Sequence, residues 1–341
     1  MTDHPAAGLY APNRARGRFF NPWAPFTQRP RDLWKFLTAA NGYRRKARVP
    51  IPQVANDGAE LRGVQHSSRI TWVGHATAII HDGADVLLTD PHFGPRALLP
   101  ARANPPGVPL SAIPAHAMAV LSHNHYDHLD EHTVMRLPAT VHWFVPTGLA
   151  DWFRARGRHR VTELGWWESA QAGAWRIHCV PAQHWSRRIG QDTNTTLWCG
   201  WVMQSADYSY YYAGDTGYFP GFREIGRRFG PVDVALLPIG AYQPRWFMRY
   251  QHMDPEEALR AFEDLGARYM IPVHWGTFDL AHEALHQPAL DLQAAMRERD
   301  TDPARVRILA IGEGWHLPHV TRSHRPAQVA AAAHSGKIMH I

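Results

Sequence analysis

The chain has few cysteines and no long hydrophobic run. Only two cysteines occur among its 341 residues, which excludes a fold held together by a disulfide framework. We expect both, Cys179 and Cys199, to be buried thiols, because each lies in an apolar, strand-like run. No apolar stretch approaches the roughly 18 residues of a membrane span, and residues 1–18 lack the apolar core of a signal peptide. These absences favour a cytoplasmic protein.

Low-complexity linkers and internal repeats are also missing. With 45% hydrophobic residues, the chain can bury one large core. We therefore expect a single folded domain over residues 61–320. An N-terminal arm precedes it over residues 1–60, and a tail with an alanine run follows over residues 321–341.

Positive charge is concentrated in the arm. Residues 1–50 contain ten Lys or Arg and two Asp, a charge of +8, so the remaining residues carry −2 of the net +6. Aromatic residues are interleaved with these cations. Such a segment can contact anionic lipid, where each cation contributes about 1 kcal/mol, or its aromatic side chains can simply cover the core. Nucleic acid is the less favoured partner.

The segment Ser122–Asp130 is the most informative part of the sequence. It contains His123, His125, Asp127 and His128 in the spacing His-x-His-x-Asp-His. A buried cluster of this kind is costly unless a cation shares its lone pairs. Imidazole nitrogen suits zinc, and the carboxylate allows a second ion beside the first. The segment therefore predicts a two-metal site on a loop at a strand end.

Three more residues follow strand-like runs further along the chain. His184 comes after residues 175–180, Asp215 after residues 208–213, and His274 after residues 269–273. Each residue alone would be unremarkable, but together and in this order they complete the set of about seven ligands that a two-metal site needs. We expect the glycines beside Asp215, Gly214 and Gly217, to let the backbone approach the ions.

With these motifs, the chain resembles the metallo-β-lactamase superfamily and, within it, the N-acyl-phosphatidylethanolamine phospholipase D family. The resemblance runs from about Phe19 to Trp315. Besides the histidine motif, it is carried by residues 71–77 (TWVGHAT), 88–91 (LTDP), 183–185 (QHW), 213–218 (AGDTGY), 226–231 (GRRFGP), 238–248 (PIGAYQPRWFM), 251–258 (QHMDPEEA) and 274–278 (HWGTF).

This resemblance implies an α/β fold, the αββα sandwich, in which helices flank two mixed β-sheets and the metals lie at one edge between them. It implies two Zn²⁺ ions per chain and a homodimer. The ligands it assigns are His123, His125 and His184 for one ion, Asp127, His128 and His274 for the other, and Asp215 as the bridge.

The activity implied by the resemblance is hydrolysis of N-acyl-phosphatidylethanolamine to N-acylethanolamine and phosphatidic acid. A hydroxide that bridges the metals would attack phosphorus, with Asp127 and Asp215 as catalytic ligands. We expect His252 to contact the phosphate or deliver a proton, unless it is a helix-capping or core histidine. Tyr242 and Arg245 are candidates for holding the phosphate.

Three residues near the motifs are candidates for orienting the ligands. Asp90 can accept a hydrogen bond from the ring N–H of a ligand histidine. Asp130 and His75 can act in the same way, or can make ordinary structural hydrogen bonds.

The substrate depends on more than the metal site. A hydrolase of a soluble phosphodiester, ester or lactone would use the same ligands, whereas the arm and the residues 240–258 favour a phospholipid at a membrane surface. The protein would then lie in the cytoplasm, peripheral on the inner face of the membrane. A nuclease is disfavoured because the chain has little room for an accessory domain. A non-catalytic binding protein and a mononuclear iron oxygenase are disfavoured because no ligand is missing.

Alternating and helical patterns predict the elements. Strands are expected at residues 69–73, 78–81, 86–89, 120–122, 141–145, 175–181, 196–204, 208–213, 233–237, 269–273 and 305–311, and helices at residues 31–40, 131–136, 148–157, 255–265 and 285–299.

Overall fold

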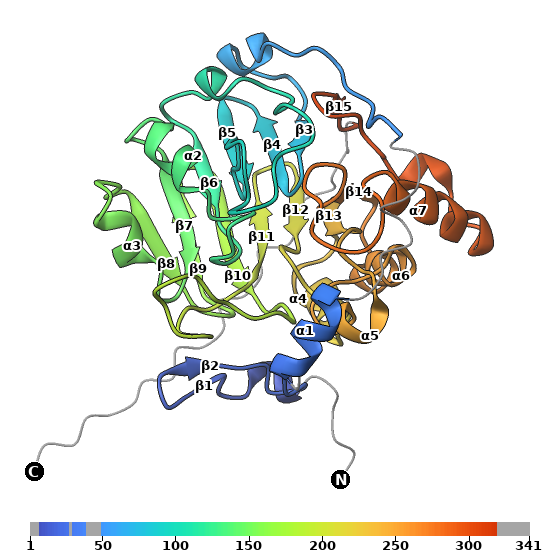
Figure 1. The fold of residues 1–341 in the computed structure, drawn as a ribbon. Helices are drawn as coiled ribbons and strands as arrows, with labels where there is room; N and C mark the ends of the chain where they lie inside the picture. The colour runs from blue at the N-terminus through green and yellow to red at the C-terminus, as the bar shows by residue number, and fades with distance from the viewer. Residues whose placement is uncertain (1–6, 27–28, 39–48, 319–341) are drawn as a thin grey trace, which may run out of the picture.

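The computed structural model describes residues 7–26, 29–38 and 49–318. Two large β-sheets face each other, and helices cover their outer faces (Figure 1). The predicted fold class, an αββα sandwich of two mixed sheets, is therefore confirmed.

Each sheet contains both parallel and antiparallel strand pairs. The seven-stranded sheet has the order β15 (Gly314–His316), β3 (Arg69–Gly74), β4 (Thr77–Asp82), β5 (Asp85–Thr89), β6 (Met118–Val120), β7 (His142–Pro146), β8 (Val161–Leu164). The six-stranded sheet has the order β14 (Tyr269–Val273), β13 (Val234–Pro238), β12 (Ser209–Tyr212), β11 (Gly200–Gln204), β10 (Trp175–Val180), β9 (Ser169–Ala172). A small hairpin of β1 (Arg14–Ala15) and β2 (Arg18–Phe19) lies outside both sheets.

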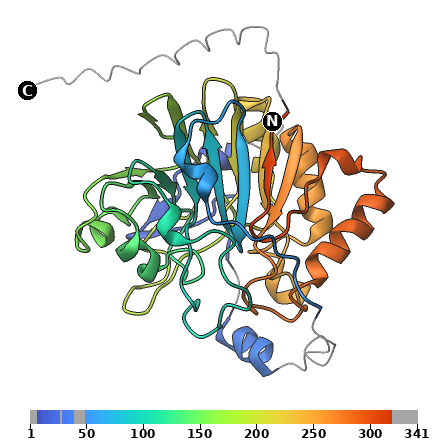
Figure 2. The same ribbon diagram turned by 90° about the horizontal axis from the view of Figure 1, so that it is seen from above.

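The helices form the outer layers. They are α1 (Pro30–Thr38), α2 (Glu131–Arg136), α3 (Ala150–Arg154), α4 (Gly221–Phe229), α5 (Arg245–Met248), α6 (Pro255–Leu265) and α7 (Gln287–Glu298). Helix α6 packs between α4 and α7 and against β13, whereas α3 contacts β8 of the other sheet. Figure 2 shows the orange helices beyond one sheet and the green helices beyond the other. Within the described part of the chain, no helix is long and apolar enough to cross a membrane.

The core lies mainly between the two sheets. Along β3 the buried Ile70 and Trp72 belong to this central cluster, whereas Val73 belongs to a second cluster on the outer face of the sheet. Successive strand residues point to opposite faces, so the seven-stranded sheet is buried on both sides. Both cysteines are buried and free, as expected.

Most predicted elements are present, with two informative differences. The strand expected at residues 305–311 is wrong: this segment makes only isolated bridges, Met270 with Val306 and Gln53 with Ile311. Its buried apolar residues pack on the core without joining a sheet. Helix α4, which contains Gly221 and Gly226, is absent from the elements expected from the sequence. A Cβ on Gly226 would lie 2.5 Å from the Leu265 carbonyl oxygen, so glycine is what allows α4 to lie against α6.

Candidate metal centre

Within each sheet, the candidate ligands follow strands that run in the same direction. Strand β4 is antiparallel to both β3 and β5, and β5 is parallel to β6. Strand β11 is likewise antiparallel to β10 and β12, and β12, β13 and β14 are parallel. The loops at the carboxyl ends of these strands carry His75 after β3, Asp90 after β5, residues 122–130 after β6, His184 after β10, Asp215 after β12 and His274 after β14.

Three histidines from two of these loops form one group of facing nitrogens. His125 Nδ1 lies 2.8 Å from His123 Nε2 and 3.2 Å from His184 Nε2. Ligands that surround a tetrahedral zinc ion at about 2.0–2.1 Å are separated by about 3.3 Å. The three nitrogens are therefore spaced as ligands of one small cation would be.

A second group of donors lies beside the first. The Asp127 Oδ2 atom is 3.3 Å from both His128 Nε2 and His274 Nε2. His75 Nε2 also lies near this carboxylate, at 3.0 Å. These four residues form a candidate metal-binding cluster. His75 therefore contacts a candidate metal ligand directly.

Asp215 faces both groups. Its Oδ2 atom is 3.1 Å from His128 Nε2 and 3.9 Å from both His123 Nε2 and His184 Nε2, while its Oδ1 atom is 3.1 Å from His274 Nε2. A carboxylate in this position can contact two ions at once. Of all the candidate residues, it is the one whose geometry matches a bridge.

The charges of the cluster are strongly coupled. Burial alone would raise the pKa of Asp215, but the surrounding imidazoles of His128 and His274 hold it well below its usual range. Burial lowers the pKa of His274, yet the Asp215 carboxylate raises it to about 9. Within the described residues, His128 Nε2 and Asp215 Oδ1, which both face the centre, are buried without a hydrogen-bond partner. A divalent cation would compensate these groups, so the donor set fits a metal.

The backbone at three of these positions is left-handed. The φ angles are 54° at His75, 31° at Asp90 and 62° at His274. This region is unfavourable for residues other than glycine. The strain is tolerated because the flanking strands fix the chain on both sides, and it turns each side chain toward the centre.

Asp90 is completely buried next to the ligands. Its carboxylate lies 2.5 Å from His128 Nδ1 and accepts hydrogen bonds from the Ser122 amide and the Tyr212 hydroxyl at 2.7 and 2.6 Å. A carboxylate that orients a metal-binding histidine makes this contact, because it fixes the His128 ring and leaves Nε2 available to bind a metal ion.

Asp130 makes structural hydrogen bonds, which is one of the two roles expected for it from the sequence. Its side chain caps α2 by accepting from the Thr133 amide at 3.1 Å and also accepts from the Gly94 amide at 2.9 Å. It also lies 3.7 Å from the imidazole of His92, which is not a candidate ligand. Asp130 therefore anchors loops and is not placed to orient a candidate ligand.

The glycines beside Asp215 serve a purpose different from the one expected. A Cβ on Gly214 would lie 2.5 Å from Ser122 Cβ, and one on Gly217 would lie 2.2 Å from the Tyr250 carbonyl oxygen. These glycines let neighbouring loops approach each other, and the expectation that they admit the ions is corrected.

His252 is brought to the centre. Its Nδ1 atom is 3.9 Å from Asp215 Oδ2, and its ring stacks on His274 with a centroid distance of 5.4 Å. It does not cap α6, because Asp254 and Glu257 form the capping box there. The ring is buried beside the candidate ligands, with Nδ1 unpartnered among the described residues.

The two candidate phosphate-holding residues are already engaged. Arg245 pairs with Glu257 at 2.6 Å and Asp254 at 3.2 Å and donates to the His252 carbonyl oxygen at 2.9 Å. Its charge is thus compensated, and it fixes the segment that carries His252, which corrects the expectation of a phosphate-holding arginine. The Tyr242 hydroxyl donates to the Asp291 carboxylate in α7, so this hydroxyl is likewise engaged by a protein group instead of facing the metal centre.

Sequence reasoning missed Arg188. This arginine is only 8% exposed and donates to the carbonyl oxygens of Asn124 at 3.1 Å and Leu129 at 2.9 Å. Its guanidinium also lies 4.0 Å from the centre of the Tyr126 ring. Arg188 therefore joins the two ends of the loop that carries His125, Asp127 and His128 through hydrogen bonds to its backbone. In the sequence, the pair Arg187-Arg188 looks like a solvated surface, and no local signal distinguishes its second member.

A buried group of imidazoles and carboxylates at the edge of an αββα sandwich defines the class of metal-dependent hydrolases with the metallo-β-lactamase fold. Comparison with known families makes this specific. A family model described as the beta-lactamase superfamily domain matches residues 86–275, and the chain belongs to this superfamily.

Relatives agree with this assignment. An uncharacterized protein of Mycobacterium tuberculosis is 38% identical over 310 residues, covering 85% of this chain and 81% of the relative. The N-acyl-phosphatidylethanolamine-hydrolyzing phospholipase D 1 of Caenorhabditis elegans is 38% identical over 265 residues, covering 72% and 74%. The family resemblance inferred from the sequence is thereby confirmed. A possible metal-dependent hydrolase from Veillonella parvula shares the fold, with a TM-score of 0.60 at 18% identity over 74% of this chain and 100% of the other.

Proposed function

We propose that this hydrolase holds two Zn²⁺ ions. His123, His125 and His184 bind one, Asp127, His128 and His274 bind the other, and Asp215 bridges them. The observation that carries the proposal is the position of Asp215, whose two oxygens face both groups of donors at 3.1–3.9 Å.

The proposed reaction is hydrolysis of a lipid phosphodiester, N-acyl-phosphatidylethanolamine. Water adds its oxygen to phosphorus, the bond on the N-acylethanolamine side breaks, and phosphatidic acid and N-acylethanolamine are released. The support is the 38% identity with the C. elegans relative that bears this activity in its name. Two bound zinc ions would supply a water of lowered pKa and positive charge beside the phosphoryl oxygens.

Residues around the candidate ligands orient the histidine rings and the substrate. Asp90 holds His128 by its Nδ1 side, and His184 Nδ1 lies 3.1 Å from the Gln251 carbonyl oxygen. Both rings therefore present Nε2 to the centre. His252 stands beside Asp215 and is proposed to contact the substrate phosphate or pass a proton to the departing oxygen. Arg245 holds the backbone of His252 in place.

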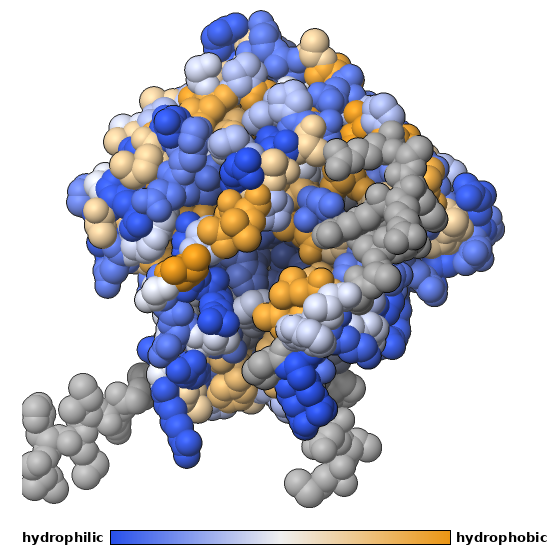
Figure 3. All heavy atoms as spheres, in the orientation of Figure 1, coloured by the Kyte–Doolittle hydropathy of each residue, from blue (hydrophilic) through white to orange (hydrophobic). Residues whose placement is uncertain are grey.

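A lipid substrate must enter from a membrane, and exposed apolar side chains suggest where. On α1, Leu33, Trp34 and Leu37 are 48–69% exposed, and on α5 Trp246 is 50% exposed beneath the Lys35 ammonium group at 4.5 Å. Helix α1 lies on the face of Figure 3, which is hollowed at its centre and has hydrophobic patches along the rim. We propose that this face rests on the inner surface of a membrane. The homodimer stays a prediction from the resemblance.

Mass spectrometry of lipid products tests the reaction. The zinc-loaded protein is given N-acyl-phosphatidylethanolamine vesicles in ¹⁸O-labelled water, with Asp215→Asn as the inactive control. The proposal expects N-acylethanolamine without label and phosphatidic acid with one ¹⁸O atom.

Two outcomes would change the assignment. Turnover of a soluble phosphodiester, ester or lactone, with no reaction on the vesicles, would keep the metal centre and refute the lipid substrate. Metal analysis that finds one ion in the active protein would refute the two-ion centre.

A further inference from the structure

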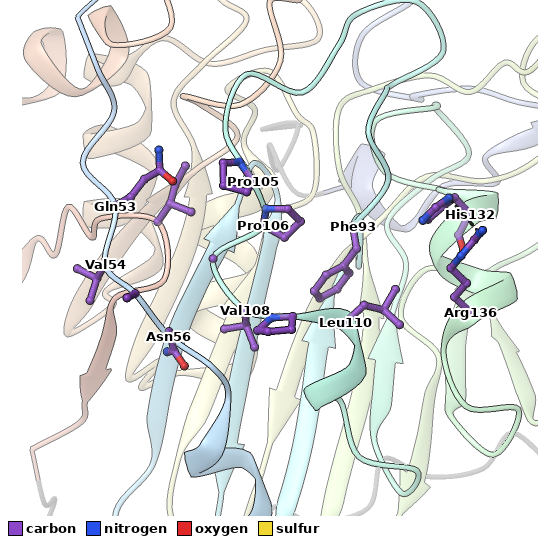
Figure 4. A pocket seen from close by; sticks show the side chains of 14 residues that line it. Gln53, Val54, Asn56, Phe93, Pro105, Pro106, Val108, Leu110, His132 and Arg136 are labelled. Carbon is purple, nitrogen blue, oxygen red and sulfur yellow. Dashed lines mark hydrogen bonds between the residues drawn. The ribbon is translucent and has the colours of Figure 1, made fainter.

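A second cavity opens on the outer side of the seven-stranded sheet. It has a volume of about 620 Å³ and is lined by three segments that are distant in sequence: residues 53–56, residues 105–110 and the α2 residues His132 and Arg136 (Figure 4). Phe93 lies between the last two segments. No candidate metal ligand lines this cavity, so it is separate from the centre described above.

The middle of the cavity is apolar, with the uncharged Gln53 and Asn56 at one end and His132 and Arg136 at the other (Figure 4). Val54, Phe93 and Leu110 contribute aliphatic and aromatic surface, and Phe93 belongs, with the fully buried Val108, to the cluster on the outer face of the sheet. Cavities of about 300–1,000 Å³ with a mostly apolar lining and a few fixed polar groups are typical of small-molecule sites.

The loop at residues 105–110 is held in place before any ligand arrives. It contains Pro105, Pro106 and Pro109, whose rings fix the φ angle. Between them, the Gly107 amide donates to the Val73 carbonyl oxygen at 2.9 Å, and a Cβ on Gly107 would lie 2.2 Å from the Gly312 nitrogen. The loop is thus pinned to β3, and a preformed wall of this kind lowers the entropy lost when a ligand binds.

The charge of the lining has one sign. Its fourteen residues include Arg136 and His132 and no Asp or Glu. The Arg136 Nη1 atom lies 3.0 Å from His132 Nδ1, and no ion pair joins either side chain to a carboxylate in the described part of the chain. The neighbouring acids are engaged elsewhere, since Glu131 pairs with Arg156 at 2.9 Å and Asp130 caps α2. An uncompensated guanidinium at the end of an apolar cavity favours a ligand with an acidic head.

We propose that this cavity binds one anionic amphiphile, with a carboxylate or phosphate-monoester head at Arg136 and an aliphatic body against Phe93, Pro106 and Leu110. The shared chemistry of the two heads is a pair of anionic oxygens that a guanidinium binds in bidentate fashion. The site is independent of which bond the metal centre hydrolyses.

Calorimetric titration with single-chain probes of equal length tests the proposal. Decanoate and decyl phosphate are compared with decyltrimethylammonium, all below the concentrations at which they form micelles. The expected result is one bound anion per chain and at least tenfold weaker binding of the cationic probe. A preference between decanoate and decyl phosphate identifies the natural head group.

Two variants separate the head from the body of the ligand. Arg136→Gln removes the cation from an exposed position, and Ala55→Trp fills the cavity from an exposed wall. Each should weaken anion binding at least tenfold. Arg160→Gln is the matched control, because Arg160 is also exposed and donates to a backbone carbonyl outside the cavity. It should bind as the unaltered protein does.

Hydrogen exchange locates the bound probe. Protection is expected at residues 105–110 and 131–136. Protection confined to residues 122–128 would place the anion at the metal centre and overturn the proposal. Equal affinity of Arg136→Gln and Arg160→Gln, equal binding of the cationic probe, or no binding of either anion would also overturn it.

Discussion

Replacing Arg188 by methionine is expected to loosen the loop that carries His123, His125, Asp127 and His128. Methionine keeps much of the aliphatic bulk but loses both hydrogen bonds, to the Asn124 and Leu129 carbonyl oxygens. The two ends of the loop are then no longer joined through one guanidinium.

The size of the effect follows from these contacts. A hydrogen bond to a charged group contributes about 1.5–3 kcal/mol, and the contact with the Tyr126 ring adds about 1–2 kcal/mol when desolvated. Burial of the charge opposes these gains, and it also lowers the pKa of Arg188. We therefore expect a net loss of roughly 2–4 kcal/mol in unfolding free energy and about 10–100-fold weaker metal binding.

Competition with a chromophoric chelator measures the metal affinity, and urea unfolding of the metal-free protein measures the stability. Arg187→Met is the matched control, since Arg187 is exposed beside Arg188 and should change neither quantity. If Arg188→Met loses stability but binds metal as tightly as the control does, Arg188 supports packing only and the reasoning about the loop is refuted.

Other perturbations have equally direct outcomes. Asp90→Asn should weaken metal binding about 10–100-fold by releasing the His128 ring; an unchanged affinity in the chelator assay would contradict this. Removing the metal with a chelator should abolish hydrolysis and lower the melting temperature, because the buried ligand charges are left uncompensated; calorimetry with and without added zinc checks this, and equal melting curves would count against a bound ion. Asp254→Ala should destabilise the fold by about 1–2 kcal/mol through loss of the α6 cap and of the contact with Arg245, measured in urea, with Asp207→Ala, at an exposed position outside any helix, as the control. Burial lowers the pKa of His178 to about 4, below the value near 6.5 of an unfolded chain. Between these values the unfolded state binds the extra proton, so stability falls as pH falls through this window. His178→Gln should reduce that loss by at most about 3 kcal/mol; identical pH profiles of the two proteins would refute this.

The sequence contains enough to predict the centre because its ligands share a local signal. Each of His184, Asp215 and His274 directly follows a strand-like run, and parallel strands bring their carboxyl ends to one edge. Helix α6 was predicted with its bounds because Asp254, Pro255 and Glu257 are local start signals.

Other roles depend on partners that are far away in the sequence. From the sequence, Arg245 is available to bind phosphate, but in the fold it forms ion pairs with Asp254 and Glu257. Asp130 is close to the candidate ligands in the sequence, but in the fold its carboxylate accepts a hydrogen bond from the Gly94 amide. Arg188 is separated by about sixty residues from the carbonyls that it holds. The apolar alternation after Arg305 reflects packing against the core and is indistinguishable by pattern from a strand.

The left-handed backbone at His75, Asp90 and His274 has a consequence for how the protein can evolve. Each position costs the fold about 1 kcal/mol that glycine would not cost. The Asp90 carboxylate offsets this cost by accepting hydrogen bonds from Ser122 and Tyr212, whereas His75 and His274 contribute to the centre more than to folding. Thermostability and the metal centre are therefore under opposing selection at the codons of His75 and His274. A library selected for folding alone should accumulate glycine or asparagine there, whereas selection for turnover should restore the native residues.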